Sequence, residues 1–421
     1  MNKVLIVGAG VQGGPCASIL ARDEEVSEIV LGDIDKELAR KARDKIGSDK
    51  IKAIKLDAAS VDDIAAAARG ADVIINLTLT AFNPFIMEAA LKSGAHYVDT
   101  SFGEPSLMDI RARDNILAQI IEKRPIALDP EFKEAGLTAL HGCGGSPGTV
   151  NVVARYICDK LDRVDEIRIK LGGRYMQATE EVVKGWEPSW SPFRALWGYA
   201  VEPTMFVDGE YRKYSTFAKP ENYRFRDPVG SVLLTYHQHQ EPITLPHFIG
   251  KGIQYCDFKY PVDTAAGAFV KMGFGSPDPV DVKGVPVIPR DVLLSLVKAP
   301  VNAFFAEDEA SAKLPINRVY LIALDIKGEQ GGEKVAYTVS LPFTLYGTTE
   351  EKIDVFQKFG TMIIGVALPA IVGAKMCVAG EADRGVICAE CLDPVKFMQM
   401  VADLGAPMKL QEVISKEINF S

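Results

Sequence analysis

The stretch KVLIVGAGVQGG, residues 3–14, places an apolar run directly before the glycine pattern Gly8-x-Gly10-x-x-Gly13. A helix-like spacing of apolar residues follows, so the glycines are expected between a strand and a helix. In that context Gly8 permits a tight turn, Gly10 lets a pyrophosphate approach the backbone, and Gly13 lets the helix pack on the strand. Free N–H groups at the helix N-terminus suit phosphate. The stretch therefore predicts a dinucleotide-binding turn, with Val11 as a further cofactor contact.

A dinucleotide-binding turn is usually followed, about 20 residues on, by an acidic residue at the end of the next strand. The stretch EIVLGDIDK, residues 28–36, supplies Asp33 there. A carboxylate at this place accepts a hydrogen bond from a ribose 2′-hydroxyl and repels a 2′-phosphate, which favours NAD and leaves NADP possible. The alternative is that Asp33 caps the following helix, although Asp35 is better placed for that role. Asp57 ends the next predicted strand and is expected near the adenine.

Predicted strands and helices then alternate as far as residue 141. The run 72–79, DVIINLTL, is almost continuously apolar, which is typical of a strand buried on both faces of a sheet. The alternation predicts an α/β fold with a Rossmann-type, doubly wound parallel sheet. Ligands bind at the carboxyl ends of such strands. We therefore expect Thr78 and Ser101, which follow two of these strands, to contact the cofactor.

A second glycine-rich turn, GCGGSPG at residues 142–148, follows a sixth predicted strand at 137–141. It is expected to open at the same edge of the sheet as the first turn, near the nicotinamide and the substrate. Gly144 is its predicted cofactor contact. The alternative is a tight turn between domains that binds no ligand. Cys143 either contacts the substrate or a proton relay, or is a small buried residue.

Composition narrows the class of protein. The chain has 421 residues, 48% of them hydrophobic and 24% charged, which is ordinary for a globular protein of about two domains. A net charge of −9 without a basic run argues against nucleic acid or an anionic membrane as partner. No apolar run is long enough to span a bilayer, and we expect no signal peptide.

The cysteines are seven in number and scattered, which favours a reduced cytoplasmic location. Cys388 and Cys391 form a single C-x-x-C without a second pair or a nearby histidine at metal spacing. We predict no metal site, because a structural zinc site needs four ligands. Buried thiols are the favoured interpretation of this pair, and a redox switch is left open.

From about residue 162 the pattern changes to short stretches of alternating apolar and polar residues, as in antiparallel strands. We predict a first domain at 1–150 and an α+β domain at 151–351, built on a mostly antiparallel sheet that binds the substrate. Within YHQHQEP, residues 236–242, His237, His239 and Glu241 would share one face of a strand. They could line the substrate pocket or, less readily, bind a metal ion.

Four stretches resemble the saccharopine dehydrogenase-like family. They are GAGVQGG (8–14), ADVIINLTLTAFNPFIMEAALKSGAHYVDTS (71–101), EAGLTALHGCGGSPGTVNVVA (134–154) and RGVICAECLDP (384–394). The resemblance implies an NAD(P)-dependent oxidoreductase that makes or breaks a C–N bond through an imine, on an amino acid or a polyamine-like substrate. It also implies that residues from about 352 to 421 pack back on the first domain, and that the sheet domain pairs two subunits into a homodimer. The chain departs from the family at two places. It has Ser146 where family members often have Asp, and it has Cys388-Ala389-Glu390 where the family segment commonly ends in Pro-Glu.

Imine chemistry needs a general acid/base close to the nicotinamide. Asp99, at the end of HYVD (96–99), is the first candidate, with capping of the following turn as its alternative. Cys143 and His239 are the other two catalytic candidates. His237 and Glu241 are expected to line the substrate pocket, and Arg174 and Arg224 are candidates for binding a substrate carboxylate. The rival functions are a hydroxyacid or sugar dehydrogenase, and a catalytically silent NAD-binding regulator.

Overall fold

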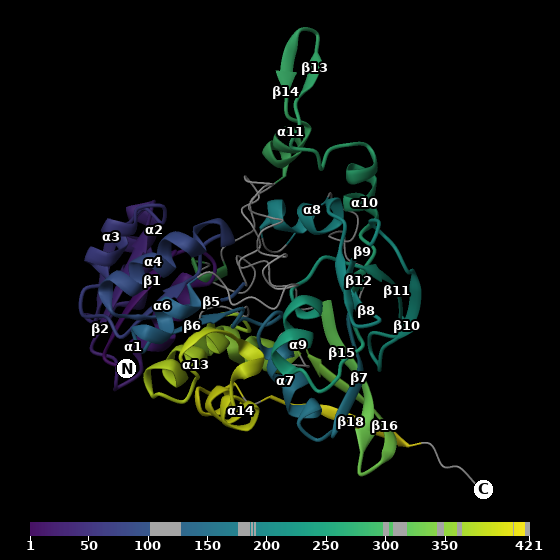
Figure 1. Cartoon of the computed structure of the whole chain (residues 1–421). Helices are drawn as coiled ribbons and strands as arrows, with labels where there is room; N and C mark the ends of the chain where they lie inside the picture. The colour runs from purple at the N-terminus through teal and green to yellow at the C-terminus, as the bar shows by residue number, and fades with distance from the viewer. Residues whose placement is uncertain are drawn as a thin grey trace, which may run out of the picture.

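The computed structural model of the chain describes residues 1–101, 128–175, 186, 188, 191–297, 303–305, 318–342, 349–359, 364–406 and 408–416. These residues form a seven-stranded sheet, built mainly from the N-terminal third of the chain, and a nine-stranded sheet beside it (Figure 1). A small hairpin of β13 (Val280–Val282) and β14 (Val285–Val287) projects from the second domain above α11 (Pro289–Leu296). Among the described residues, no helix combines the length and the apolar character needed to cross a bilayer.

The seven-stranded sheet is parallel throughout, in the order β17-β6-β5-β4-β1-β2-β3. Its strands are β1 (Lys3–Val7), β2 (Glu28–Asp33), β3 (Ile51–Lys55), β4 (Val73–Asn76), β5 (His96–Asp99), β6 (Thr138–His141) and β17 (Gly385–Cys388). Successive residues of β1 enter opposite hydrophobic layers, because neighbouring side chains of a strand point to opposite faces.

Helices cover both faces of this sheet. Val4 and Ile6 of β1 lie in the layer of α1 (Gly13–Ala21), α2 (Lys36–Ile46) and α13 (Ala367–Val378). Leu5 and Val7 lie in the layer of α3 (Val61–Ala67), α4 (Asn83–Ser93) and α6 (Asp129–Glu134). The predicted doubly wound, Rossmann-type sheet is confirmed.

One of the two edge strands of this sheet, β17, comes from the C-terminal part of the chain. It pairs in parallel with β6, from Gly385 opposite Thr138 to Cys388 opposite His141. The helices on either side of it in the chain, α13 and α14 (Pro394–Asp403), pack on the same domain. The next strand, β18 (Gln411–Lys416), instead pairs with β16 of the other sheet. The C-terminal segment is therefore shared between the two sheets.

The second sheet runs in the order β10-β11-β12-β7-β15-β16-β18, with β8 and β9 attached at β12. Among its described pairs only β12 with β7 is parallel. The expected mostly antiparallel sheet is thus confirmed. Besides β18, its strands are β7 (Arg163–Tyr175), β8 (Thr204–Val207), β9 (Glu210–Lys213), β10 (Glu221–Arg224), β11 (Ser231–Tyr236), β12 (Tyr255–Pro261), β15 (Arg318–Gln330) and β16 (Glu333–Pro342).

Helices α7 (Thr149–Cys158) and α9 (Glu241–Ile249) share a hydrophobic core with this sheet. The N-terminus of α7 follows directly on the second glycine turn, and α9 follows soon after β11. Smaller elements complete the described chain: η1 (Thr80–Phe82), α8 (Pro192–Ala200), α10 (Thr264–Lys271), η3 (Ala303–Phe305), α12 (Thr349–Phe359) and η4 (Ala389–Cys391). The two domains meet where the glycine turns open.

Candidate active site

The first glycine turn has the geometry that its sequence predicts. Gly8 has a φ of +101°, which favours glycine, and a Cβ on Gly13 would lie 1.9 Å from the carbonyl oxygen of Gly8. A Cβ on Gly10 would meet nothing described within 4 Å, so the backbone there is open to a ligand. Asp33 ends β2 and accepts a hydrogen bond from the backbone N–H of Ala9 at 2.8 Å. The carboxylate therefore faces the turn, as a dinucleotide site requires.

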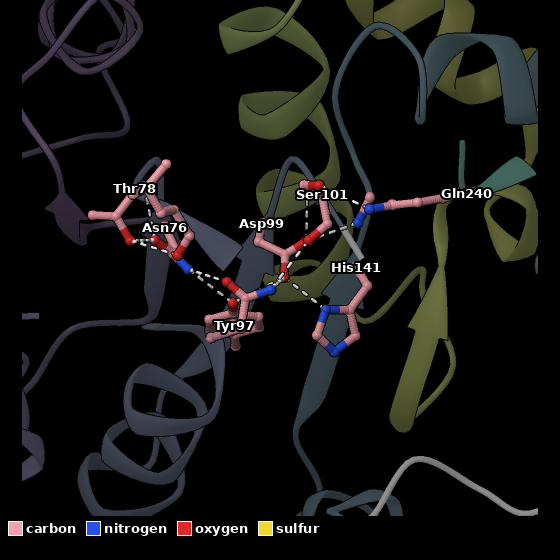
Figure 2. Close-up of polar contacts among 10 residues, drawn as sticks. Asn76, Thr78, Tyr97, Asp99, Ser101, His141 and Gln240 are labelled. Atoms are coloured by element: carbon pink, nitrogen blue, oxygen red, sulfur yellow. Dashed lines mark hydrogen bonds and ion pairs between the residues drawn. The ribbon is translucent and has the colours of Figure 1, made fainter. Parts of the chain in front are cut away.

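Three other predicted cofactor contacts lie along the edge where the parallel strands end. Thr78 follows β4 and lies beside the first turn, since a Cβ on Gly8 would meet its Cγ2 at 3.1 Å. Ser101 follows β5, and its hydroxyl accepts a hydrogen bond from Gln240 of the second domain at 2.8 Å (Figure 2). Asp57 follows β3 and is exposed. Val11 lies half-buried in the first turn.

Thr78 and Asp99 are joined by a chain of buried amide and phenol groups. The backbone N–H and the hydroxyl of Thr78 both donate to Asn76 Oδ1, at 2.9 and 2.7 Å. Asn76 Nδ2 donates to Asn83 Oδ1 at 2.8 Å and to the hydroxyl of Tyr97 at 3.0 Å (Figure 2). Asn83 begins α4 without capping it, because its side chain is used in this network. The carboxyl ends of β4 and β5 are thereby locked together.

Asp99 is the centre of this network, and its side chain is only 3% exposed. Five groups hydrogen bond its two oxygens. They are Asn83 Nδ2 at 2.8 Å, Tyr97 Oη at 2.9 Å and His141 Nδ1 at 2.6 Å on Oδ2, with the N–H groups of Gly142 at 2.8 Å and Ser101 at 3.2 Å on Oδ1.

A carboxylate whose two oxygens are both engaged has little capacity left to exchange a proton with a substrate. The hydrogen bond from Ser101 N–H caps the turn that follows β5, which is the role that we considered as the alternative to catalysis. The geometry therefore favours a structural role for Asp99, which holds the ends of β5 and β6 and both turns that follow them. His141 was missed by sequence reasoning, because its contact with Asp99 spans 42 residues.

The second glycine turn is closed as tightly as the first. Gly148 has a φ of +127°, and a Cβ there would lie 1.9 Å from the carbonyl oxygen of Gly144. Gly144 N–H donates to the carbonyl of Pro147 at 3.0 Å, which closes the turn. A Cβ on Gly144 would press on backbone oxygens on both sides, at 3.1 Å. The turn is therefore a rigid element at the junction of the domains.

Cys143 lies in this turn but points into the hydrophobic core. It is fully buried, and its thiol donates to the carbonyl of Pro369 at 3.1 Å. Burial raises the pKa of this thiol well above its ordinary value, so it is neutral at physiological pH. This geometry favours the alternative that Cys143 is a small buried residue, because a reactive cysteine needs an exposed, stabilised thiolate.

His239 and Glu241 form a hydrogen-bonded pair at the domain junction. The expected strand ends earlier, at Tyr236, and Glu241 is the first residue of α9, so the shared strand face was wrong. His239 Nδ1 nevertheless hydrogen bonds Glu241 Oε2, while Ser146 Oγ in the second glycine turn donates to Oε1 at 2.5 Å. The two side chains are therefore close because the chain turns into α9 between them, and not because they share a strand.

Glu241 is completely buried, whereas the side chain of His239 is 22% exposed. Burial alone would raise the pKa of Glu241, but the charge and hydrogen bond of His239 and the bond from Ser146 lower it below its ordinary value. The imidazole of His239 stacks on Phe258, with ring centroids 3.9 Å apart. Its Nδ1 and its ring plane are therefore fixed, and Nε2 is the nitrogen available for proton exchange.

A second buried carboxyl group, Glu390 in η4, lies close to this pair. Asn151 of α7 donates from Nδ2 to Glu390 Oε2 at 3.0 Å, and the hydroxyl of Thr244 also hydrogen bonds the carboxyl group. Burial, with a smaller contribution from the charge of Glu241, raises the pKa of Glu390 to about 7. The sequence singled out Glu390 only as part of a family motif and gave no sign of its burial.

Three predicted substrate-binding residues remain. His237 is buried between Tyr199 and Tyr260, and burial lowers its pKa to about 3, so it is a neutral packing residue. Arg224 is exposed at the end of the edge strand β10 and is not brought to the site. The side chain of Arg174, in β7, lies outside the described residues.

The C-x-x-C pair shows no bond between its sulfur atoms. Cys388 ends β17 and Cys391 belongs to η4, and both are free thiols. Burial raises the pKa of Cys391 to about 12 and that of Cys388 well above its ordinary value. Within the part of the chain that the structure describes, no three His, Cys, Asp or Glu side chains are grouped to hold a metal ion.

A dinucleotide-binding turn at the carboxyl edge of a parallel, doubly wound sheet is the arrangement found in nicotinamide-dependent oxidoreductases. Residues 4–140 match the saccharopine dehydrogenase NADP-binding domain, and residues 144–406 match the saccharopine dehydrogenase C-terminal domain. The chain therefore belongs to the saccharopine dehydrogenase family, and the resemblance predicted from sequence is confirmed.

Curated relatives match along almost the whole chain. A carboxyaminopropylagmatine dehydrogenase from Synechocystis is 26% identical, with 97% of each chain covered. A carboxynorspermidine synthase from Vibrio alginolyticus is 23% identical, again with 97% of each chain covered. Among solved structures, the saccharopine dehydrogenase (L-Glu forming) of Saccharomyces cerevisiae has a TM-score of 0.67 at 16% identity, covering 98% of this chain and 100% of its own. This last similarity establishes a shared fold.

Proposed function

We propose that the chain interconverts a secondary amine and an imine on a substrate that joins an amino-acid carbon skeleton to a polyamine-like amine. In the oxidative direction, the carbon that bears the nitrogen loses a hydride and the nitrogen loses a proton. Water then adds to the imine, and a carbonyl compound and a primary amine separate. A nicotinamide dinucleotide whose pyrophosphate is held at the first glycine turn would take up the hydride in this direction and supply it in the other. The protein must orient the substrate and move the proton.

His239 is the residue that we assign to proton transfer, in place of Asp99. The observation that carries the proposal is the fixed His239–Glu241 pair, joined through Ser146 to the turn next to the nicotinamide end of the site. A buried carboxylate that orients an imidazole and stabilises its protonated form is the arrangement that general acid/base catalysis uses. Asp99 is a positioning residue, and Gly144 and Ser101 remain proposed cofactor contacts.

The relatives support the substrate class. The names carboxyaminopropylagmatine and carboxynorspermidine both denote a carboxyl-bearing group joined to a polyamine-like amine. A substrate of this kind needs a cation to bind its carboxylate, and we keep Arg174 as the candidate for that role. NAD is the proposed preference, because Asp33 stands where a 2′-phosphate would be repelled; NADP is the alternative, in keeping with the name of the matched domain. Cytoplasmic location and a homodimer are proposed from the free cysteines and the family resemblance.

The first test is a turnover assay that follows NADH and NADPH fluorescence. The panel contains saccharopine, carboxynorspermidine, carboxyaminopropylagmatine and lysine with oxidised cofactor, and 2-hydroxy acids and sugars as the comparison set. We expect reduction of the cofactor with at least one of the amines and none with the comparison set. Turnover restricted to a hydroxy acid or sugar would replace the proposal by the rival dehydrogenase. Cofactor binding without any turnover would favour the silent regulator.

The second test concerns the choice of cofactor. The variant Asp33→Ser removes a charge-assisted hydrogen bond, which is worth roughly 1.5–3 kcal/mol. We expect NADH affinity to fall by at least about 10-fold, and NADPH affinity to rise or stay constant. Asp35→Ser is the matched control, because Asp35 caps α2 and serine keeps that cap. An unchanged ratio of the two affinities in Asp33→Ser would remove Asp33 from cofactor selection.

A further inference from the structure

Glu390 is a buried carboxyl group for which the proposed reaction has no assigned use. It lies in η4, directly after β17, and is 0% exposed. Asn151 Nδ2 donates to its Oε2 at 3.0 Å, but its Oε1 has no hydrogen-bond partner among the residues that the structure describes. An ionised carboxylate buried in this way costs considerable free energy, whereas a protonated carboxyl group costs much less.

Glu390 and Glu241 approach the same face of α9. Asn151 Nδ2 also lies 3.3 Å from Thr244 Oγ1, and Thr244 hydrogen bonds the Glu390 carboxyl group. Thr244 is three residues after Glu241 on the helix, so their side chains point to the same side. Two carboxyl groups therefore share one dry region, where each disfavours ionisation of the other.

The second glycine turn is held between these two carboxyl groups. Ser146 at one end donates to Glu241, and Gly148 N–H at the other donates to Asn151 Oδ1 at 3.0 Å. Asn151 in turn holds Glu390. The partners of the two groups nevertheless differ. The imidazole of His239 beside Glu241 favours the charged form of that carboxyl group. At Glu390 the neutral donors also favour the charged form, but burial outweighs them and favours the protonated form.

We propose that Glu390 is a positioning residue that sets the protonation state of His239 through Glu241. While Glu390 is protonated, Glu241 is the single buried negative charge beside His239. When Glu390 releases its proton to water, a second negative charge in the same region holds His239 as an imidazolium over a wider pH range. This inference rests on the proposed function, because it assumes that His239 transfers the proton.

The other groups that face Glu390 do not compete for this role. Arg155 of α7 donates from Nη1 to the backbone carbonyl of Glu390 at 3.3 Å, and it carries its charge at every relevant pH. Four further titratable groups lie near Glu390, and burial raises the pKa of each, so that they are neutral between pH 5 and about 9. They are Tyr211, Cys256, Cys388 and Cys391.

The test compares Glu390→Gln with the wild type in the oxidative direction over pH 5–10. Glutamine keeps the size of the side chain but cannot titrate. In the wild type we expect the rise of kcat/KM with pH to reflect two ionisations. In Glu390→Gln we expect one ionisation and a midpoint lower by about one pH unit, from the Coulomb energy of two charges at an effective dielectric constant of about 20. Glu381→Gln is the control, since Glu381 pairs with Lys396 on the protein surface and should leave the profile unchanged.

Two measurements separate this inference from the proposed function. The chain has five histidines, so an NMR titration of imidazole-labelled protein can follow His239, assigned with His239→Asn, without any turnover. We expect the His239 midpoint to be lower in Glu390→Gln, and superimposable titrations would overturn the inference even if amine turnover were found. If the variant does not fold, infrared difference spectra of the wild type replace it. They should show a protonated carboxyl band at pH 6 that is lost by pH 9, and its absence would also overturn the inference.

Discussion

Replacing Glu241 by glutamine tests the proposed acid/base pair most directly. The substitution keeps the shape of a completely buried side chain and removes the charge that His239 Nδ1 meets. A hydrogen bond to a charged group contributes about 1.5–3 kcal/mol, which corresponds to a loss of about 10- to 150-fold in kcat if it is made fully in the transition state. Ser146→Ala removes the bond from an uncharged hydroxyl to the other oxygen of the same carboxylate and leaves the contact with the imidazole in place. We therefore expect a smaller loss of kcat in Ser146→Ala than in Glu241→Gln, because the charge beside His239 remains.

The assay measures kcat and KM of both variants on whichever amine the panel identifies, together with NADH binding by fluorescence. NADH affinity should stay within about twofold of the wild type, because the cofactor turn lies in the other domain. Circular dichroism and thermal melting establish that each variant is folded. A Glu241→Gln enzyme that is folded and retains at least half of the wild-type kcat would refute the role of the His239–Glu241 pair. Equal losses in the two variants would show that the turn, rather than the imidazole, depends on Glu241.

Three further predictions concern the framework of the site. Asp99→Asn replaces an acceptor of five hydrogen bonds by an amide, so it should lower the free energy of unfolding, measured in urea, by about 2–4 kcal/mol. Its control is Asp57→Asn, at an exposed position after β3, which should change the free energy of unfolding by less than about 0.5 kcal/mol. Gly148→Ala should prevent closure of the second turn and cost at least about 3 kcal/mol. Gly136→Ala, with a φ of +65° and open space around it, should cost only about 1–2 kcal/mol, and equal costs would contradict the close contact with Gly144. Burial lowers the pKa of His237 to about 3, below its unfolded value of about 6.5, so the stability that neutral His237 contributes is complete above pH 6.5 and is lost as the pH falls towards 3. When the pH is lowered from 7 to 4, the free energy of unfolding measured in urea should therefore fall by roughly 3 kcal/mol less in His237→Phe than in the wild type. Equal falls in the two proteins would contradict this.

Local sequence patterns were sufficient for the first domain. The apolar run of β1 sends Val4 and Leu5 into opposite layers, so a strand buried on both faces could be recognised from its composition alone. Both glycine turns were also predictable, because glycine is required at 13 and 148 by contacts with backbone atoms only four or five residues away in the chain. The position of Asp33 followed from the regular length of the intervening helix.

The chemistry of the site depends on contacts that no local pattern encodes. Asp99 looked like a free carboxylate at a strand end, and only the fold reveals that His141 and Asn83 occupy its oxygens. His239 and Glu241 were predicted to lie together as alternate residues of one strand. They do lie together, but because the chain turns into α9 between them. The environment of Glu390 depends on Asn151, which is 239 residues away along the chain. The burial of Glu390 therefore depends on tertiary packing and could not be predicted from the residues around it in the sequence.

The late origin of β17 has a consequence for how the protein is made. The edge of β6 is completed by residues 385–388, so on the ribosome the cofactor-binding sheet lacks this edge strand while every strand of the second sheet except β18 is synthesised. At roughly 5–20 residues per second, the intervening stretch of about 250 residues takes about 12–50 seconds to appear. During that time the edge of β6, buried in the finished protein, is open to pairing with other nascent chains. Since β18, which pairs with β16 of the second sheet, follows β17 in the chain, both sheets receive their last strand only when this C-terminal segment is made.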